Sequence, residues 1–194
     1  MPKMKTIILA SSSPRRKEIL EKMGLKFNVD ESDYEENTDM SLEPHELAIR
    51  HSIGKARAVA PKYRNALIIS ADTIVVLKNR VFGKPRNRKE AKEMLKTLSG
   101  KAHIVITGYT IMDTGSGKET SKSVESKVFF KRLTDDEIDT YIRSGEPLDK
   151  AGAYGVQGLG ALIVKRIEGD FFNVMGLPLN ALAEGLKKFG IRVL

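Results

Sequence analysis

Residues 11–16, Ser-Ser-Ser-Pro-Arg-Arg, constrain the fold of this chain more than any other stretch. They follow an apolar run at residues 6–10 and precede a helical pattern at residues 17–23, which predicts a strand, a turn and the start of a helix. A serine N-cap before a proline at the first helical position is a strong start signal. The unpaired backbone N–H groups, next to two guanidinium groups, favour a phosphate. The alternative interpretation is an ordinary capped helix with solvated arginines.

The size and composition of the chain favour one globular α/β domain, which we expect to span residues 1–194. Hydrophobic residues make up 41% of the chain and charged residues 30%, as in ordinary globular proteins. The absence of cysteine excludes disulfides, thiol nucleophiles and cysteine-based zinc sites. Because no apolar run approaches the roughly 20 residues of a membrane helix and no secretory signal is visible, we expect a cytoplasmic protein without a membrane partner.

The formal net charge of +8 favours an anionic partner. Nucleic acid, a membrane surface and a small phosphorylated ligand would all satisfy this charge, so charge alone does not choose among them. The basic residues are scattered, and the aromatic content of 6% is low for a surface that stacks single-stranded bases. We therefore expect no stable complex with nucleic acid.

Periodicity along the chain predicts alternating strands and helices. Strands are expected at residues 26–30, 66–70 with a continuation at 73–77, 102–113, 121–133 and 161–167, and helices from residues 44, 88 and 135 and over 179–189. Asn87 is the expected cap of the helix from residue 88, and Thr134 with Glu137 the expected capping box of the helix from residue 135. The helix from residue 44 is expected to bury a stripe of Ile49, Ile53, Ala56 and Ala60. Residues 145–160 are too rich in glycine for a regular element, so their backbone is expected to approach something closely.

Several polar residues interrupt apolar patterns at the expected ends of elements. They are Ser11, Arg15, Arg16, Glu36, Lys55, Asp72, Lys84 and Gln157. In open α/β sheets ligands bind at the carboxyl ends of strands, where we expect Ser11 and Asp72. Lysine and arginine side chains offset phosphate charge, and aspartate and glutamate side chains bind a hard metal cation. The combination therefore suits a polyphosphate with its divalent metal. Taken singly, Lys55 and Lys84 are also typical of solvated side chains, and the three histidines show no metal-ligand spacing.

With these residues in place, the chain resembles the Maf-like nucleoside triphosphate pyrophosphatases over nearly its whole length. The resemblance rests on a set of short motifs that are specific only in combination. They are residues 10–16 (ASSSPRR), 35–36 (EE), 55–56 (KA), 71–73 (ADT), 83–85 (GKP), 98–100 (LSG) and 146–160 (EPLDKAGAYGVQGLG).

The resemblance implies a fold, a reaction and a cofactor. The implied fold is a long twisted mixed β-sheet flanked by helices, with two lobes and a central cleft, as in Maf and inosine triphosphatase proteins. The implied reaction cleaves a nucleoside triphosphate into its monophosphate and pyrophosphate with Mg²⁺ or Mn²⁺. Asp72 would activate the attacking water, and Glu36 with Asp72 would bind the metal, although the choice between Glu35 and Glu36 stays open. Ser11, Arg16, Lys55 and Lys84 would bind the phosphates.

Three further residues match the branch of the family that acts on dTTP and UTP. These are Arg15, Thr73 and Gln157, where a branch that prefers 7-methyl-GTP has Trp, Gln and Glu. A glutamine amide offers both an acceptor and a donor, which matches the N3–H and carbonyl groups of a pyrimidine. Pyrimidines that carry a modification elsewhere on the ring keep this edge unchanged, so the glutamine would bind them in the same way.

A different class of function is a nucleotide-sensing or nucleic-acid-binding protein without turnover, since the family is associated with arrest of cell division. Glu36 and Asp72 discriminate between the two hypotheses, because a protein that only binds a polyanion gains nothing from carboxylates in its phosphate site. The enzyme is therefore the favoured interpretation. Homodimers are common among the relatives, so we expect a nucleoside triphosphate and a second copy of the chain as partners.

Overall fold

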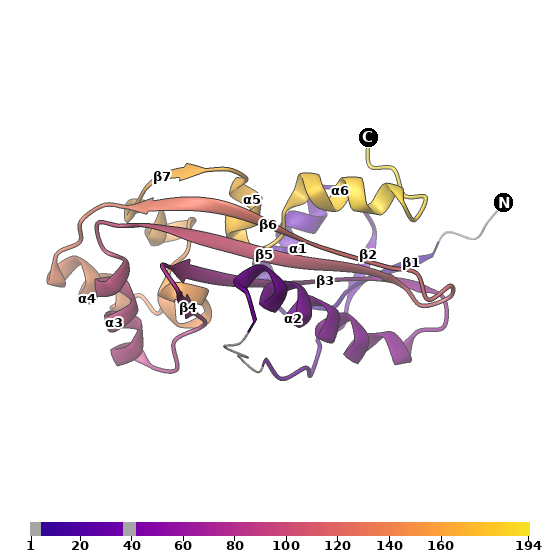
Figure 1. Ribbon diagram of the computed structural model, residues 1–194, viewed down its shortest axis with the longest axis horizontal. Helices are drawn as coiled ribbons and strands as arrows, with labels where there is room; N and C mark the ends of the chain where they lie inside the picture. Colours follow the sequence, from indigo (N-terminus) through magenta and orange to yellow (C-terminus); the bar gives the residue numbers. More distant parts are fainter. Residues whose placement is uncertain (1–4, 37–41) are drawn as a thin grey trace. The chain divides into compact units, whose positions relative to one another are not determined.

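The computed structural model of this chain describes residues 5–36 and 42–194. They form a seven-stranded sheet with the strand order β2-β1-β3-β5-β6-β7, in which β4 also pairs with β3 (Figure 1). β1 pairs in parallel with β2 and with β3, whereas β4 and β7 pair antiparallel to β3 and β6. The predicted mixed α/β sheet with flanking helices is confirmed.

The elements follow the predicted order with small shifts at their ends. The strands are β1 (Thr6–Leu9), β2 (Phe27–Val29), β3 (Ala66–Leu77), β4 (Arg80–Phe82), β5 (Ala102–Asp113), β6 (Glu119–Phe130) and β7 (Val164–Glu168). The helices are α1 (Pro14–Glu21), α2 (Pro44–Val59), α3 (Arg88–Leu98), α4 (Asp135–Arg143), α5 (Phe171–Met175) and α6 (Leu179–Lys187). Short 3₁₀ turns are η1 (Ala60–Lys62), η2 (Glu146–Asp149), η3 (Ala151–Ala153) and η4 (Gly158–Leu162). The sequence did not predict α5 or the 3₁₀ turns.

The helix start signals read from the sequence operate as side-chain caps. The Ser13 side chain accepts a hydrogen bond from the Arg16 N–H at the start of α1. Asn87 caps α3, and Thr134 forms a full capping box with Glu137 at the start of α4. Each cap satisfies backbone donors that a helix leaves unpaired in its first turn, so these three residues determine where the helices begin.

The chain divides into two compact units, which is in keeping with the two lobes expected from the sequence. Unit 1 contains Met1–Asp72, Thr107–Val124 and Gly176–Leu194, and unit 2 contains Thr73–Ile106 and Glu125–Met175. The boundaries between the units fall inside β3, β5 and β6. The central cleft and the single domain over residues 1–194 stay predictions.

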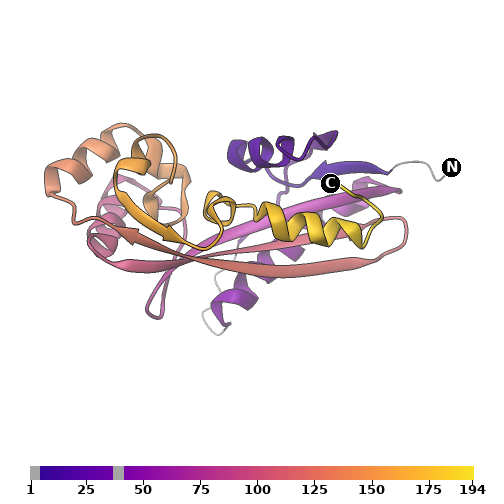
Figure 2. The same cartoon turned by 90° about the horizontal axis from the view of Figure 1, so that it is seen from above.

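In unit 1 helices cover both faces of the sheet. A Cβ atom at Gly108 of β5 would lie 2.3 Å from the backbone of Ala48, so α2 packs directly on that face. A Cβ atom at Gly185 of α6 would lie 2.8 Å from Cδ1 of Ile111, which points to the other face of β5. Figure 1 shows α2 and α6 on opposite sides of the strands, and Figure 2 shows the hairpin that joins β5 to β6.

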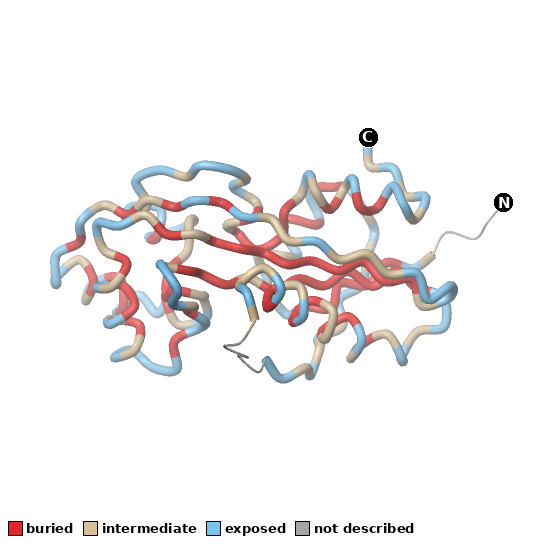
Figure 3. Tube along the Cα trace, viewed as in Figure 1, coloured by how far each residue is buried: buried red, intermediate tan, exposed pale blue. Residues whose placement is uncertain are grey.

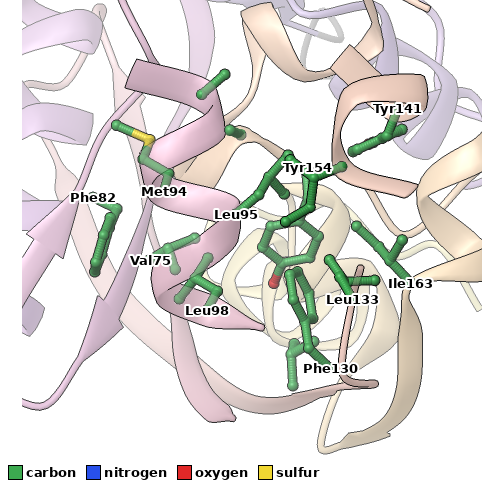
Figure 4. Packing of buried hydrophobic residues seen from close by; sticks show 14 of the residues in the cluster. Val75, Phe82, Met94, Leu95, Leu98, Phe130, Leu133, Tyr141, Tyr154 and Ile163 are labelled. Atoms are coloured by element: carbon green, nitrogen blue, oxygen red, sulfur yellow. The ribbon is translucent and has the colours of Figure 1, made fainter. Parts of the chain in front are cut away.

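Unit 2 has its own hydrophobic core beneath α3 and α4. Members of this core include Val75, Phe82, Leu95, Leu98 and Phe130, which come from two strands of the sheet, the short β4 and α3 (Figure 4). Removing this apolar surface from water is what holds the short α3 and α4 against the sheet, because isolated helices of this length are marginal.

Two sequence predictions about the site elements are wrong in detail. Asp72 does not end a strand but lies inside β3, which is buried over nearly its whole length (Figure 3). On α2, Ile49 and Ile53 are only half-buried, while His51 and Lys55 belong to the buried face. Lys55 is buried against Asp72 and His51 against Tyr34, whereas Ala56 is buried as predicted, so hydrophobicity alone places only part of the stripe. Within residues 5–36 and 42–194, no helix has the length and apolar character needed to cross a membrane.

Candidate functional site

The turn between β1 and α1 is organised around the Ser11 hydroxyl. Its Oγ accepts hydrogen bonds from the Ser13 N–H at 3.3 Å and from Nη1 of Arg16 at 3.2 Å. Nε of Arg16 donates to the Gly176 carbonyl at 2.9 Å, which anchors the guanidinium group to the segment before α6. The serine and the arginine are therefore held together at the N-terminal end of α1, where an anion is favoured.

Lys55 joins two carboxylates that lie far apart in the sequence. Its Nζ is 2.6 Å from Oδ1 of Asp72 and 2.6 Å from Oε1 of Glu36. Asp72 is 4% exposed and Lys55 is 9% exposed, whereas the Glu36 side chain is 44% exposed. Because both oxygens contact one nitrogen, they are separated by at most twice that distance.

The alternation of β3 and the periodicity of α2 explain why Lys55 meets Asp72. Ser70 Oγ donates to the Ser52 carbonyl of α2 at 2.6 Å, so this face of β3 points to that helix. Asp72 is two residues further along β3 and shares the same face, and Lys55 is about one helical turn after Ser52. β1 pairs with β3 only as far as Ile69, so Asp72 lies beyond the end of the neighbouring parallel strand.

The segment that carries Glu36 is placed by Tyr34. A Cβ atom at Gly54 would lie 2.2 Å from the Tyr34 ring, so the ring rests directly on the backbone of α2. The Tyr34 hydroxyl is hydrogen-bonded to Nδ1 of His51 at 3.3 Å. Sequence reasoning missed this support. The available signal was the spacing of His51, Gly54 and Lys55 on one turn of α2, together with a tyrosine two residues before Glu36.

Charges of both signs meet around Arg16. Burial lowers the pKa of Arg16, while the nearby carboxylates of Asp72 and Glu36 oppose that change and Arg15 adds to it. Arg15 is half-buried on the same helix turn. Unit 1 thus brings together the predicted residues Ser11, Arg15, Arg16, Glu36, Lys55 and Asp72.

The carboxylate oxygens of Glu36 and Asp72 fit a hard divalent cation whose other ligands would come from the bound nucleotide and water. Glu36 and Asp72 offer carboxylate oxygens, and Mg²⁺ is commonly bound by one or two carboxylates together with substrate phosphates and water. Across the described ranges 5–36 and 42–194, no group of three or more histidine, cysteine, aspartate or glutamate residues is arranged to hold a metal ion. The structure therefore offers two carboxylates rather than a cage built from protein alone.

The remaining predicted residues, Thr73, Lys84 and Gln157, belong to unit 2. Thr73 is half-buried in β3, Lys84 is exposed after β4, and Gln157 is half-buried between η3 and η4. The Gly152 N–H donates to the Gly83 carbonyl at 3.0 Å, which ties the segment before Lys84 to the glycine-rich segment that carries Gln157.

Fold and site together define an α/β protein with a serine-arginine turn at a helix N-terminus and two carboxylates bridged by a lysine. A family model described as Maf-like protein matches residues 6–189. The chain belongs to this family, which confirms the resemblance seen in its motifs.

Similar proteins match the chain over nearly its whole length. It is 51% identical to a dTTP/UTP pyrophosphatase of Methanosarcina mazei, over 98% of this chain and 97% of that protein. It is 50% identical to a dTTP/UTP pyrophosphatase of Thermoanaerobacter sp. (strain X514), over 97% of this chain and 99% of that protein. It is 45% identical to one of Desulforamulus reducens, over 98% of this chain and 100% of that protein.

Proposed function

We propose that this protein is a nucleoside triphosphate pyrophosphatase that hydrolyses dTTP and UTP to the monophosphate and pyrophosphate. The observation that carries the proposal is the contact of Lys55 with both Glu36 and Asp72, beside the guanidinium group of Arg16. The names of the similar proteins support the substrate.

The triphosphate is bound by cations and by the first turn of α1. Arg16 offers planar donors to phosphate oxygens, and the Ser11 hydroxyl contributes a hydrogen bond. Lys55 and Lys84 add positive charge, which offsets the charge of the phosphates and of the leaving pyrophosphate. Arg16 is already oriented by Ser11 and Gly176, so little of its side-chain freedom is lost when phosphate binds.

Glu36 and Asp72 are the residues that would hold Mg²⁺ or Mn²⁺. When bound, the metal would neutralise phosphate charge and polarise the phosphoryl group. Glu36 is assigned in preference to Glu35 because its carboxylate contacts the same ammonium group as Asp72.

Asp72 acts as the base for the attacking water. Lys55 engages Oδ1, so we assign the proton of the water to Oδ2. The oxygen of the water forms a bond to the α-phosphorus while the bond to the bridging oxygen breaks and pyrophosphate leaves. Burial of Asp72 in β3 fixes the direction of its carboxylate, which is the requirement for a base that must meet one water molecule.

Arg15, Thr73 and Gln157 would select the base. The Gln157 amide can donate to a carbonyl and accept from N3–H, whereas a glutamate would only accept. Pyrimidine nucleotides with modifications away from this edge would remain substrates. A homodimer and a cytoplasmic location stay predictions from the sequence.

The decisive experiment is hydrolysis of a panel of canonical and modified nucleoside triphosphates with Mg²⁺ or Mn²⁺, scored separately for pyrophosphate and phosphate. We expect pyrophosphate from dTTP and UTP, and its loss in Asp72→Asn. Asp139→Asn is the matched control, because Asp139 forms a half-exposed ion pair with Lys92 in unit 2. Saturable nucleotide binding without turnover would overturn the proposal in favour of a nucleotide-sensing protein.

A further inference from the structure

A glycine-rich loop in unit 2 holds Gln157 between anchored backbone groups. We call residues 155–160 the Gln157 loop. Three of its N–H groups donate to side chains outside it: Gly155 to the Tyr141 hydroxyl at 3.0 Å, Leu159 to Oε2 of Glu146 at 3.0 Å, and Gly160 to Oε1 of Glu146 at 3.1 Å. These bonds lie on both sides of Gln157, so the loop is fixed before and after this residue.

The two anchoring side chains are also bonded to each other. The Tyr141 hydroxyl donates to Oε1 of Glu146 at 2.9 Å. Burial raises the pKa of Tyr141, and the neighbouring Glu146 adds to this, so the hydroxyl stays protonated and keeps its donor. Glu146 thus accepts three hydrogen bonds, and bonds to a charged acceptor are stronger than neutral ones. The Glu146–Tyr141 pair forms one connected support for the loop.

The glycines of the loop permit this close approach. A Cβ atom at position 158 would lie 2.7 Å from Oε2 of Glu146, and Gly158 has a φ of +59°. A Cβ atom at position 160 would lie 2.8 Å from the Tyr141 hydroxyl and 2.2 Å from the Gly155 carbonyl oxygen. The close approach expected from the glycine content is therefore an approach to Glu146 at position 158, and to the Gly155 backbone and Tyr141 at position 160.

The support is built on the packed core of unit 2. Tyr141 lies on α4, whose buried side chains Ile138, Tyr141 and Ile142 belong to the core cluster. Tyr154 and Ile163, which flank the loop in sequence, belong to the same cluster (Figure 4). Both ends of the Gln157 loop and its support are therefore attached to one packed core, and packing of this kind is what a precise recognition site needs.

We propose that Glu146 and Tyr141 are positioning residues that set base specificity by holding the Gln157 loop in one conformation. The inference rests on the proposed function, since it takes Gln157 to be the residue that reads the pyrimidine. A glutamine amide discriminates between bases only when its donor and its acceptor are fixed in direction. Loosening the loop should therefore weaken pyrimidine binding while leaving phosphate binding unchanged.

The test is Glu146→Gln, which keeps the shape but turns one oxygen into a donor that faces other donors. Binding of α,β-imido-UTP, α,β-imido-ATP and inorganic triphosphate is measured by calorimetry, and exchange of the loop amides is measured by hydrogen exchange. We expect faster exchange at Gly155, Leu159 and Gly160, and about a tenfold loss of the preference for UTP over ATP, typical of losing one hydrogen bond to a charged group. Affinity for inorganic triphosphate should stay within about twofold.

Tyr141→Phe is the second variant, because it keeps the buried ring and removes only the hydroxyl. Glu168→Gln is the matched control, since Glu168 forms an exposed ion pair with Arg166 in the same unit. Faster loop exchange with an unchanged UTP preference in both variants would overturn the proposal, as would an equal loss of affinity for all three ligands. Because the analogues are not hydrolysed, these results judge the inference even if the wild-type protein hydrolyses no nucleotide.

Discussion

Replacing Lys55 by methionine tests the acidic pair and the metal assignment together. Methionine keeps most of the length of the lysine side chain and removes the ammonium group that contacts Oδ1 of Asp72 and Oε1 of Glu36. The variant leaves two carboxylates close together without their shared cation. We expect a less stable protein that binds a divalent cation more tightly than the wild type, because the ammonium and the metal compete for the same oxygens.

Burial sets the size of the loss. Asp72 is 4% exposed and Lys55 is 9% exposed, and removing one partner of a buried ion pair costs about 3–5 kcal/mol. Glu36 adds little because its side chain is 44% exposed. Arg16 remains close to both carboxylates, so we expect a loss at the lower end of this range, roughly 3 kcal/mol at pH 7 in EDTA. This corresponds to a fall of roughly 6–12 °C in Tm for a chain of this size.

The assay is thermal unfolding in EDTA and across a Mn²⁺ titration. A cation that binds only the folded variant adds about 2.7 kcal/mol at 100 times its Kd, which would restore most of the loss. Lys62→Met is the matched control, because Lys62 pairs with Asp30 at the surface and its loss should cost no more than about 1 kcal/mol. A variant that is destabilised but gains no more from Mn²⁺ than the wild type would refute the assignment of Glu36 and Asp72 to the metal.

Three other substitutions test packing and burial. Gly108→Ala should cost about 3 kcal/mol in urea unfolding, because its Cβ would lie 2.3 Å from the backbone of Ala48, and an unchanged midpoint would contradict that packing. Gly54→Ala should displace Tyr34 and weaken metal binding about tenfold in a Mn²⁺ titration, with Tm nearly unchanged. Burial lowers the pKa of His103 to about 4, below its value of about 6.5 in the unfolded chain. The contribution of His103 to the free energy of unfolding should therefore be fully present above pH 6.5 and fall by roughly 3 kcal/mol as the pH approaches 4. His103→Phe should flatten that pH dependence in urea unfolding, and an unaltered slope would contradict it.

Local signals predicted the elements well where a residue acts on its own neighbours. Ser13, Asn87 and Thr134 cap the helices that the sequence assigned to them, because a cap satisfies donors within the next few residues. The mixed sheet and the family membership are likewise confirmed. The prediction of a dTTP/UTP pyrophosphatase agrees with the names of the similar proteins.

The errors occur where a distant partner overrides the local pattern. The charge of Asp72 predicts a break between the apolar runs at 66–70 and 73–77, but Lys55 balances that charge and β3 runs through Asp72 without interruption. For the same reason α2 buries Lys55 and His51, which a stripe of apolar residues could not predict. In both cases the polar residue is buried because its partner comes from another element, and sequence spacing does not contain that information.

The glycine-rich segment marks the limit of what the sequence could predict about the site. The spacing of Gly155, Gly158 and Gly160 shows that the backbone must come close to something, because only glycine tolerates such contacts. It does not identify the partner, since any side chain or a ligand could fill that role. The structure places the carboxylate of Glu146 against Gly158, in the same motif as Gln157 and eleven residues before it. The motif therefore contains both Gln157, which we propose contacts the base, and Glu146, which shapes the loop. Contacting the ligand and positioning the loop can be distinguished only when phosphate binding and base preference are measured independently.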